Sequence, residues 1–207
     1  MSGEEQVSAL GSLQVYARSS ATVADGLEHT ETYTPQGLLT MFVHRPRSAP
    51  SAAIVTGGGA MGGVLGPGHA LFHRLGETWP ARGVGVYRVG YRQPNELDRC
   101  AHDMACAVET ALADGAERVV VMGHSFGGAV AIRVAVVMTA EVAGVVTFST
   151  QSAGCEVAGA LAGRPLLLFH GDRDELLPIE SSEMVRMIAG HGDLVVLPDD
   201  GHLLGRS

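Results

Sequence analysis

The sequence predicts an α/β fold, a doubly wound and mostly parallel sheet that forms a single domain. From residue 52 onward, short runs that are apolar on both faces alternate with helical patterns, as in a parallel sheet covered by helices. The chain has 207 residues, 46% of them hydrophobic, which suffices for one full core but not for two ordinary domains. We expect residues 1–12 to be a flexible tail and residues 13–207 to be the domain.

The predicted strands fall into two groups. Residues 13–18 and 38–45 have the composition of strands and are joined by a polar stretch, so we expect them to form an antiparallel pair at one edge of the sheet. The strands of the parallel sheet are predicted at residues 52–57, 83–91, 118–123, 143–149, 165–171 and 193–199.

Helices are predicted where apolar residues recur every three or four positions. One such stripe runs from Leu71 to Trp79, and residues 96–113 form a second helix with Asn95 as its N-cap. Residues 126–138 are apolar nearly all round, so this helix must be buried against the centre of the sheet. A last helix over residues 179–189 follows Pro178 and ends before Gly190.

Composition and charge exclude several classes of function. The formal net charge is −8 at pH 7, so we expect no nucleic-acid partner. All 14 basic residues are arginine, which removes Schiff-base chemistry on lysine and the P-loop lysine. The N-terminus lacks a signal-peptide pattern, and no apolar run approaches the ~20 residues of a membrane span. We therefore expect a cytoplasmic protein without a membrane partner.

The three cysteines favour the same compartment, because an odd number leaves at least one thiol free. Cys100, His102, Asp103 and Cys106 mix the residue types that bind metals. Their spacing on a helix does not bring them to one point, so we expect no metal site.

The segment Gly123-His124-Ser125-Phe126-Gly127 matches G-x-S-x-G between a buried strand and a buried helix. A sharp turn there strains the backbone of Ser125, and a side chain at position 123 or 127 would collide with the neighbouring strand and helix. The turn lifts the Ser125 hydroxyl above the sheet edge. It also places the Phe126 N–H at a helix N-terminus, where it can bind an oxyanion.

A serine nucleophile needs a base, and the base needs an acid that orients it. The loop HGDRD follows one strand and offers Asp172 and Asp174, and the loop DDGH follows the last strand and offers His202. Both loops lie at the carboxyl edge of the sheet, as Ser125 does. Asp199 and Asp200 are too close to His202 in sequence to orient its ring, and we expect His124 and His170 to be packed histidines with satisfied hydrogen bonds.

With GHSFGG, HGDRD and DDGH together, the sequence resembles the α/β-hydrolase superfamily over about residues 35–204, in particular its small dienelactone-hydrolase-like and lidless esterase members. The resemblance implies Ser125 as nucleophile and His202 as base. The family's G-x-x-D spacing from Gly171 selects Asp174 as the acid and leaves Asp172 as a hydrogen-bond acceptor that stabilises the loop. It implies no cofactor.

The same resemblance sets two expectations about shape. The short interval between the strands at 143–149 and 165–171 leaves no room for a lid domain, so the site should be open and suited to small acyl groups. The C-terminus is shortened, because no helix follows His202. We expect a partner subunit of a homo-oligomer to cover the exposed face.

The stretch AAIVTGGGAMGG, residues 52–63, allows two interpretations. Gly57, Gly59 and Gly62 spell the dinucleotide-binding pattern G-x-G-x-x-G. However, the next strand ends in Arg88 and Arg92, which suit a 2′-phosphate but not a ribose, and the helix begins too late to meet a diphosphate. In a hydrolase, the loop supplies the second oxyanion donor. That donor is predicted to be the Gly59 amide, with Ala60 or Met61 next in line.

The predicted function is a serine hydrolase that cleaves a small carboxylic ester, lactone or thioester through an acyl-enzyme intermediate. Its only predicted partner, apart from a second copy of itself, is this small-molecule acyl substrate, with Met61 and Tyr91 lining the pocket. Two alternatives stay open. One is a small-molecule binder that keeps the serine without turnover, and the other is an acyl-transfer or cyclase-type enzyme whose acceptor is not water.

Overall fold

The computed structural model describes residues 8–207. A nine-stranded sheet has the order β1-β2-β3-β5-β4-β6-β7-β8-β9, and all pairs from β5 to β9 are parallel. The parallel strands are β4 (Ala52–Gly57), β5 (Val84–Gly90), β6 (Val119–His124), β7 (Val142–Phe148), β8 (Leu166–Gly171) and β9 (Asp193–Leu197). The predicted fold class is confirmed, and the predicted parallel strands lie within two residues of the observed ones.

The antiparallel edge differs from the prediction. It contains three strands, β1 (Ala17–Ala24), β2 (Leu27–Thr34) and β3 (Gly37–His44). The polar stretch expected to join two strands is itself β2, and it pairs with both neighbours. Every residue of β1 is exposed. A strand with both faces in water needs no apolar alternation, which is why the sequence pattern did not reveal this hairpin.

The predicted flexible tail lies partly outside the described residues, because residues 1–7 are not among them. From residue 8 the chain is packed. Residues Ala9–Ser12 form helix α1, and the N–H groups of Ala9 and Leu10 donate to the Glu109 carboxylate at 2.6 and 2.7 Å. The prediction of a loose tail is therefore wrong for residues 8–12.

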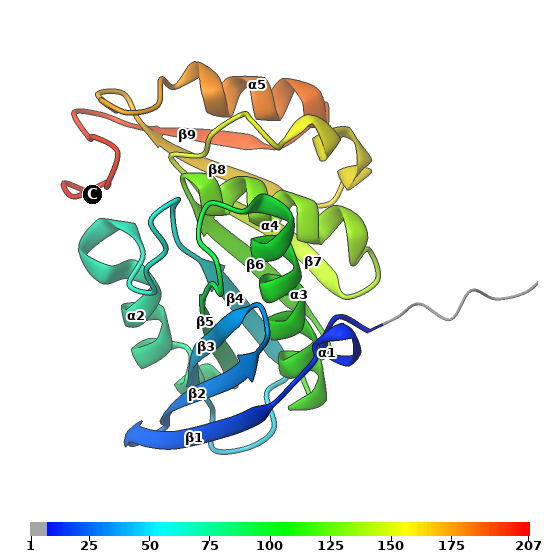
Figure 1. Cartoon of the computed structure of the whole chain (residues 1–207). Helices are drawn as coiled ribbons and strands as arrows, with labels where there is room; N and C mark the ends of the chain where they lie inside the picture. The colour runs from blue at the N-terminus through cyan, green and yellow to red at the C-terminus, as the bar shows by residue number, and fades with distance from the viewer. Residues whose placement is uncertain (1–7) are drawn as a thin grey trace, which may run out of the picture.

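Helices cover both faces of the parallel sheet. Helices α3 (Leu97–Ala113) and α4 (Phe126–Val137) lie on one face, and α2 (Pro67–Thr78) lies on the other (Figure 1). The short helix η2 (Glu156–Leu161) and α5 (Glu180–Ala189) extend the first layer, and the 3₁₀ turn η1 (Pro80–Arg82) follows α2. Helix α4 carries nine buried residues, as its all-round apolar composition predicted.

One predicted helix cap is wrong and another is correct. Helix α3 begins at Leu97 with Glu96 as N-cap, and no side chain caps it. Asn95 instead has a φ of 69°, in the left-handed region, and belongs to the preceding turn. Gly190 ends α5 with a φ of 72°, the conformation that favours glycine at this position.

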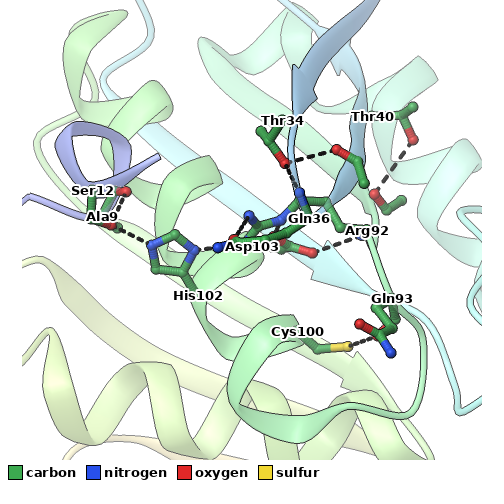
Figure 2. A network of polar contacts seen from close by, with 12 residues as sticks. Ala9, Ser12, Thr34, Gln36, Thr40, Arg92, Gln93, Cys100, His102 and Asp103 are labelled. Carbon is green, nitrogen blue, oxygen red and sulfur yellow. Dashed lines mark hydrogen bonds and ion pairs between the residues drawn. The ribbon is translucent and has the colours of Figure 1, made fainter. Parts of the chain in front are cut away.

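A buried polar network fixes the start of α3 against the end of β5 (Figure 2). The guanidinium of Arg92 donates to Asp103 at 2.5 Å, and the Arg92 N–H donates to the same carboxylate at 2.8 Å. A second guanidinium nitrogen bonds to Nδ1 of His102, whose Nε2 bonds to Ser12 of α1. The network therefore ties α1, α3 and β5 together.

Three further findings concern the cysteines, the residue types that bind metals, and the helices. Cys100, Cys106 and Cys155 are buried and free. No three His, Cys, Asp or Glu side chains in residues 8–207 are grouped to hold a metal ion. In the same range, no helix combines the length and apolar character that crossing a bilayer requires.

Candidate active site

Ser125 stands at a strained turn between β6 and α4. Its backbone has φ 56° and ψ −119°, a conformation that costs about 1–3 kcal/mol for a residue with a side chain. The Ser125 N–H donates to the carbonyl of Phe148 on β7 at 2.8 Å. Phe126 is the first residue of α4, so its N–H has no acceptor within the helix. The predicted geometry of the turn is present.

The glycines beside Ser125 are required by contact with backbone. A Cβ on Gly123 would lie 1.8 Å from the carbonyl oxygen of Gly127, and a Cβ on Gly127 would lie 2.4 Å from that of Gly58. Neither position can take a side chain unless the backbone moves. Strand β6, helix α4 and the loop of residues 58–66, which we call the glycine loop, are thus in close backbone contact. This packing holds the strained turn in place.

His202 follows β9 and is bonded to Asp174, which follows β8. The distance from His202 Nδ1 to the Asp174 carboxylate is 2.7 Å. Because a carboxylate accepts, Nδ1 is the donor, and in the neutral tautomer of the ring the lone pair is on Nε2. The other carboxylate oxygen of Asp174 accepts the N–H groups of Leu176 and Leu177 at 2.9 and 2.8 Å.

These hydrogen bonds control the charge of Asp174. Burial alone would raise the pKa of this carboxyl group, but the Leu177 N–H, the His202 ring and the Leu176 N–H together hold the pKa below its ordinary value. Asp174 is therefore a carboxylate at neutral pH. Asp172, the other candidate from the sequence, accepts the N–H of Asp199 at 2.7 Å instead, so it joins its own loop to the loop after β9.

Two histidines that the sequence marked as packed residues contact this arrangement directly. His170 bonds to Ser182 and to the carbonyl of Leu177, and its Nε2 lies 3.3 Å from the Asp174 carboxylate. His124 donates from Nε2 to the carbonyl of His202 at 2.9 Å, and the two rings are 4.8 Å apart. Burial lowers the pKa of His124. The sequence predicted that both are satisfied, but not which groups they hold.

A cavity of about 420 Å³ brings these groups together. Ser125 is half-buried and His202 is 6% exposed. No direct hydrogen bond joins their side chains within residues 8–207, and such contacts often close only when substrate binds. The cavity is lined by residues 58–66 together with His124, Ser125, Leu176, His202 and Leu203.

The glycine loop forms one wall of this cavity. A Cβ on Gly59 would lie 3.6 Å from the Cβ of Ser125, so the backbone of the loop approaches the serine closely. Met61 lines the cavity and is 95% exposed. The prediction for Tyr91 is wrong, because its ring lies in the hydrophobic core beside Met104. The ring of Tyr91 packs among core residues of the helix layer, and the residue is 7% exposed.

Comparison with known proteins identifies the family. The model of the phospholipase/carboxylesterase family matches residues 95–202, which is more than half of the chain. The chain belongs to the phospholipase/carboxylesterase family. No curated protein matches the sequence. The matched region includes Ser125, Asp174 and His202, and membership in this family makes the protein a hydrolase of the α/β-hydrolase superfamily.

Solved structures confirm the fold of this phospholipase/carboxylesterase-family chain. Est1E from Butyrivibrio proteoclasticus has a TM-score of 0.67 at 18% identity, covering 85% of this chain and 90% of its own. Dienelactone hydrolase from Anabaena variabilis has a TM-score of 0.66 at 17% identity, covering 91% and 90%. A predicted CIB-like hydrolase from Thermoplasma acidophilum has a TM-score of 0.66 at 19% identity, covering 85% and 88%.

The dinucleotide interpretation of the glycine loop finds no support in this family member. Arg88 is buried and bonds to His44 and Val64, and Arg92 bonds to Asp103. Neither arginine is available for a 2′-phosphate. Helix α2 begins only at Pro67, so the loop residues next to Ser125 do not lead directly into a helix N-terminus.

Two other features of this hydrolase contain side chains that can carry chemistry. A larger cavity of about 660 Å³ lies between α3 and α4. The rim residues Asp98 and Glu109 are already bonded, to Arg133 and to α1. The cysteines are no alternative nucleophiles, because burial raises the pKa of each thiol to about 12. Of these two cavities, the smaller one is lined by the strained Ser125 and by His202.

Proposed function

We propose that this hydrolase cleaves small carboxylic esters, lactones or thioesters, with Ser125 as nucleophile, His202 as general base and Asp174 as the acid that orients His202. The observation that supports this assignment is the single cavity lined by the strained Ser125 and by His202, whose ring is fixed by Asp174 at 2.7 Å. The proposal needs no cofactor and no metal.

The proposed reaction has two stages. His202 Nε2 removes the proton of the Ser125 hydroxyl while Oγ attacks the acyl carbon, and the protonated ring then gives this proton to the leaving oxygen or sulfur. The product of this stage is an acyl-enzyme. In the second stage, His202 removes a proton from water, the resulting hydroxide attacks the acyl carbon, and the acid leaves as Ser125 regains its proton. Asp174 stabilises the imidazolium in both stages.

The proposed oxyanion donors are the backbone amides of Phe126 and Gly59. Phe126 offers the first N–H of α4, and Gly59 is a loop residue whose backbone approaches Ser125. Two amides directed at the developing charge stabilise the tetrahedral intermediate, and removal of one such donor typically costs about 10²–10³-fold in rate.

The shape of the cavity favours short acyl groups. Residues 149–165 connect β7 to β8 and contain only the six-residue helix η2, so no lid covers the site from that segment. Leu176 and Leu203 at the cavity are 68% and 65% exposed. We therefore expect p-nitrophenyl acetate and butyrate to be hydrolysed faster than the octanoate. Est1E has been solved with ferulic acid, which makes a small aromatic ester a useful addition to the series.

The test is Ser125→Ala beside wild type and Ser20→Ala, an exposed serine on β1. We expect Ser125→Ala to abolish hydrolysis of p-nitrophenyl acetate and stoichiometric labelling by a fluorophosphonate probe, while Ser20→Ala behaves as wild type. Equal rates for Ser125→Ala and wild type would contradict the proposal. A wild type that is never labelled, yet is stabilised thermally by the same esters, would indicate the non-hydrolytic binder. Formation of new esters or amides in preference to the free acid, with alcohols or amines added, would indicate acyl transfer.

A further inference from the structure

Arg88 on β5 is a buried cation that the reaction proposed above does not use. The residue is 3% exposed. Within residues 8–207, no carboxylate forms an ion pair with it. A buried charge is normally paired, because removing it from water is costly. Glu77 on α2 is near enough to favour the charged form of Arg88 and opposes the lowering of its pKa by burial, but it does not contact the guanidinium directly. The groups that Arg88 does contact must therefore explain its position.

The guanidinium of Arg88 is held by neutral groups. One nitrogen bonds to Nε2 of His44 at 3.0 Å, and another donates to the carbonyl oxygen of Val64 at 3.2 Å. The ring of Phe42 lies 5.1 Å from the guanidinium carbon. Arginine can only donate, so His44 Nε2 must accept. Burial, with Arg88 and His73 nearby, lowers the pKa of His44 to about 4, and the ring is neutral at pH 7.

Val64 links this cation to the candidate active site. It belongs to the loop of residues 58–66, which lines the cavity beside Ser125. The loop folds back on itself. The Gly62 N–H donates to the Gly59 carbonyl at 2.9 Å, and a Cβ on Gly58 would lie 2.3 Å from the carbonyl oxygen of Gly63. Because the two limbs of the loop touch, the position of Val64 limits where Gly59 can lie.

We propose that Arg88 is a positioning residue for the glycine loop, residues 58–66. Its guanidinium holds residues 62–66 through the Val64 carbonyl, and residues 58–61 are thereby fixed against Ser125. The forked guanidinium is suited to this role because it reaches His44 and Val64 at once. This inference rests on the proposed function only for its effect on catalysis. The hydrogen bond from Arg88 to the Val64 carbonyl, which we call the tether, is present without substrate.

The catalytic test compares Arg88→Met and Arg88→Lys with Arg74→Met, an exposed arginine on α2. For Arg88→Met we expect kcat for p-nitrophenyl acetate, measured per fluorophosphonate-labelled site, to fall about 10- to 100-fold, part or all of the effect of losing one oxyanion donor. We expect KM to change less than threefold and the affinity for a boronic acid, which mimics the tetrahedral intermediate, to fall in step with kcat. The kcat of Arg88→Lys should lie between the values for Arg88→Met and wild type, and the kcat of Arg74→Met should equal that of wild type.

The tether is tested separately by amide hydrogen exchange across residues 58–66 without substrate. We expect faster exchange in both Arg88 variants than in Arg74→Met. Unchanged exchange in this loop would overturn the inference, as would a variant with a lowered Tm and wild-type kcat per labelled site. If Arg88→Met does not fold, Arg88→Lys carries both measurements. A wild type that neither hydrolyses nor is labelled contradicts the proposed function, and the exchange result then decides on the tether alone.

Discussion

The strained backbone of Ser125 is the residue-scale feature on which the site depends. Its φ of 56° is stable because Gly123 and Gly127 let the strand, the helix and the glycine loop approach within distances that no side chain tolerates. His202 is fixed in a similar way, through its ring by Asp174 and through its carbonyl by His124. Both contacts of His202 can therefore be tested by changing one residue at a time.

Asp174 and Asp172 form a matched pair, because they are two residues apart in one loop and only Asp174 contacts His202. We expect Asp174→Asn to lower kcat by about 10⁴-fold, since an amide favours the wrong tautomer of the imidazole. Asp172→Asn should lower kcat less than tenfold. Steady-state kinetics on p-nitrophenyl acetate checks both. Similar losses in the two variants would mean that Asp174 has no special role.

His124 is expected to position the base through the carbonyl of His202. His124→Phe removes the Nε2–H donor, a loss worth about 1 kcal/mol, so we expect kcat to fall about five- to tenfold with little change in KM. His124→Gln, whose amide can donate from a similar place, should recover part of that loss. If the Gln and Phe variants have the same kcat, the hydrogen bond does not position the base.

At the scale of elements, the network of Arg92 and Asp103 joins β5, α3 and α1 (Figure 2). The side chains of this pair are 2% and 0% exposed. Burial raises the pKa of Asp103 although Arg92 opposes the shift, so the pair depends on the direct contact. No sequence pattern indicated this pair, because residues 92 and 103 come from different elements.

Breaking this pair should destabilise the whole domain. We expect Asp103→Ala to lower the free energy of unfolding by about 3–5 kcal/mol, because it leaves the Arg92 charge buried without a partner. Asp98→Ala is the control, since Asp98 pairs with Arg133 but is 90% exposed, and it should cost less than about 1 kcal/mol. Urea denaturation measures both. Equal changes in the two variants would refute the argument.

At the scale of the whole molecule, buried neutral histidines make stability depend on pH. The pKa of His44 is about 4 in the folded protein, against an ordinary value of 6.5. Between these values the unfolded chain binds more protons, so stability is complete above pH 6.5 and is lost as pH falls toward 4. Burial lowers the pKa of His102 and His124 as well, and both add to the same trend.

His44→Leu isolates the largest of these contributions. We expect the variant to be less stable than wild type at pH 7, because Arg88 loses an acceptor. We also expect it to lose less stability between pH 7 and pH 4.5, and the full His44 contribution corresponds to about 3 kcal/mol. Urea denaturation at the two pH values checks the difference. A variant with the same pH dependence as wild type would show that His44 is not the titrating group.

The sequence by itself determined the parallel sheet, the turn at Ser125 and the loops that carry Asp174 and His202. These follow from local patterns: apolar runs, glycines at a tight turn, and the rule that parallel strands present their carboxyl ends at one edge. The hairpin of β1 and β2 escaped this reasoning because every residue of β1 is exposed and the half-buried strand β2 is mostly polar, so neither strand shows the apolar alternation.

Only the tertiary structure decided which groups hold the site together. It placed His124 on the carbonyl of His202, His170 beside Asp174, Arg88 on Val64, and the ring of Tyr91 in the core. The physical reason is that these contacts join segments far apart in the chain. Whether a polar side chain meets solvent, a partner or a neighbouring loop depends on the packing of the whole domain and not on its own neighbours in sequence.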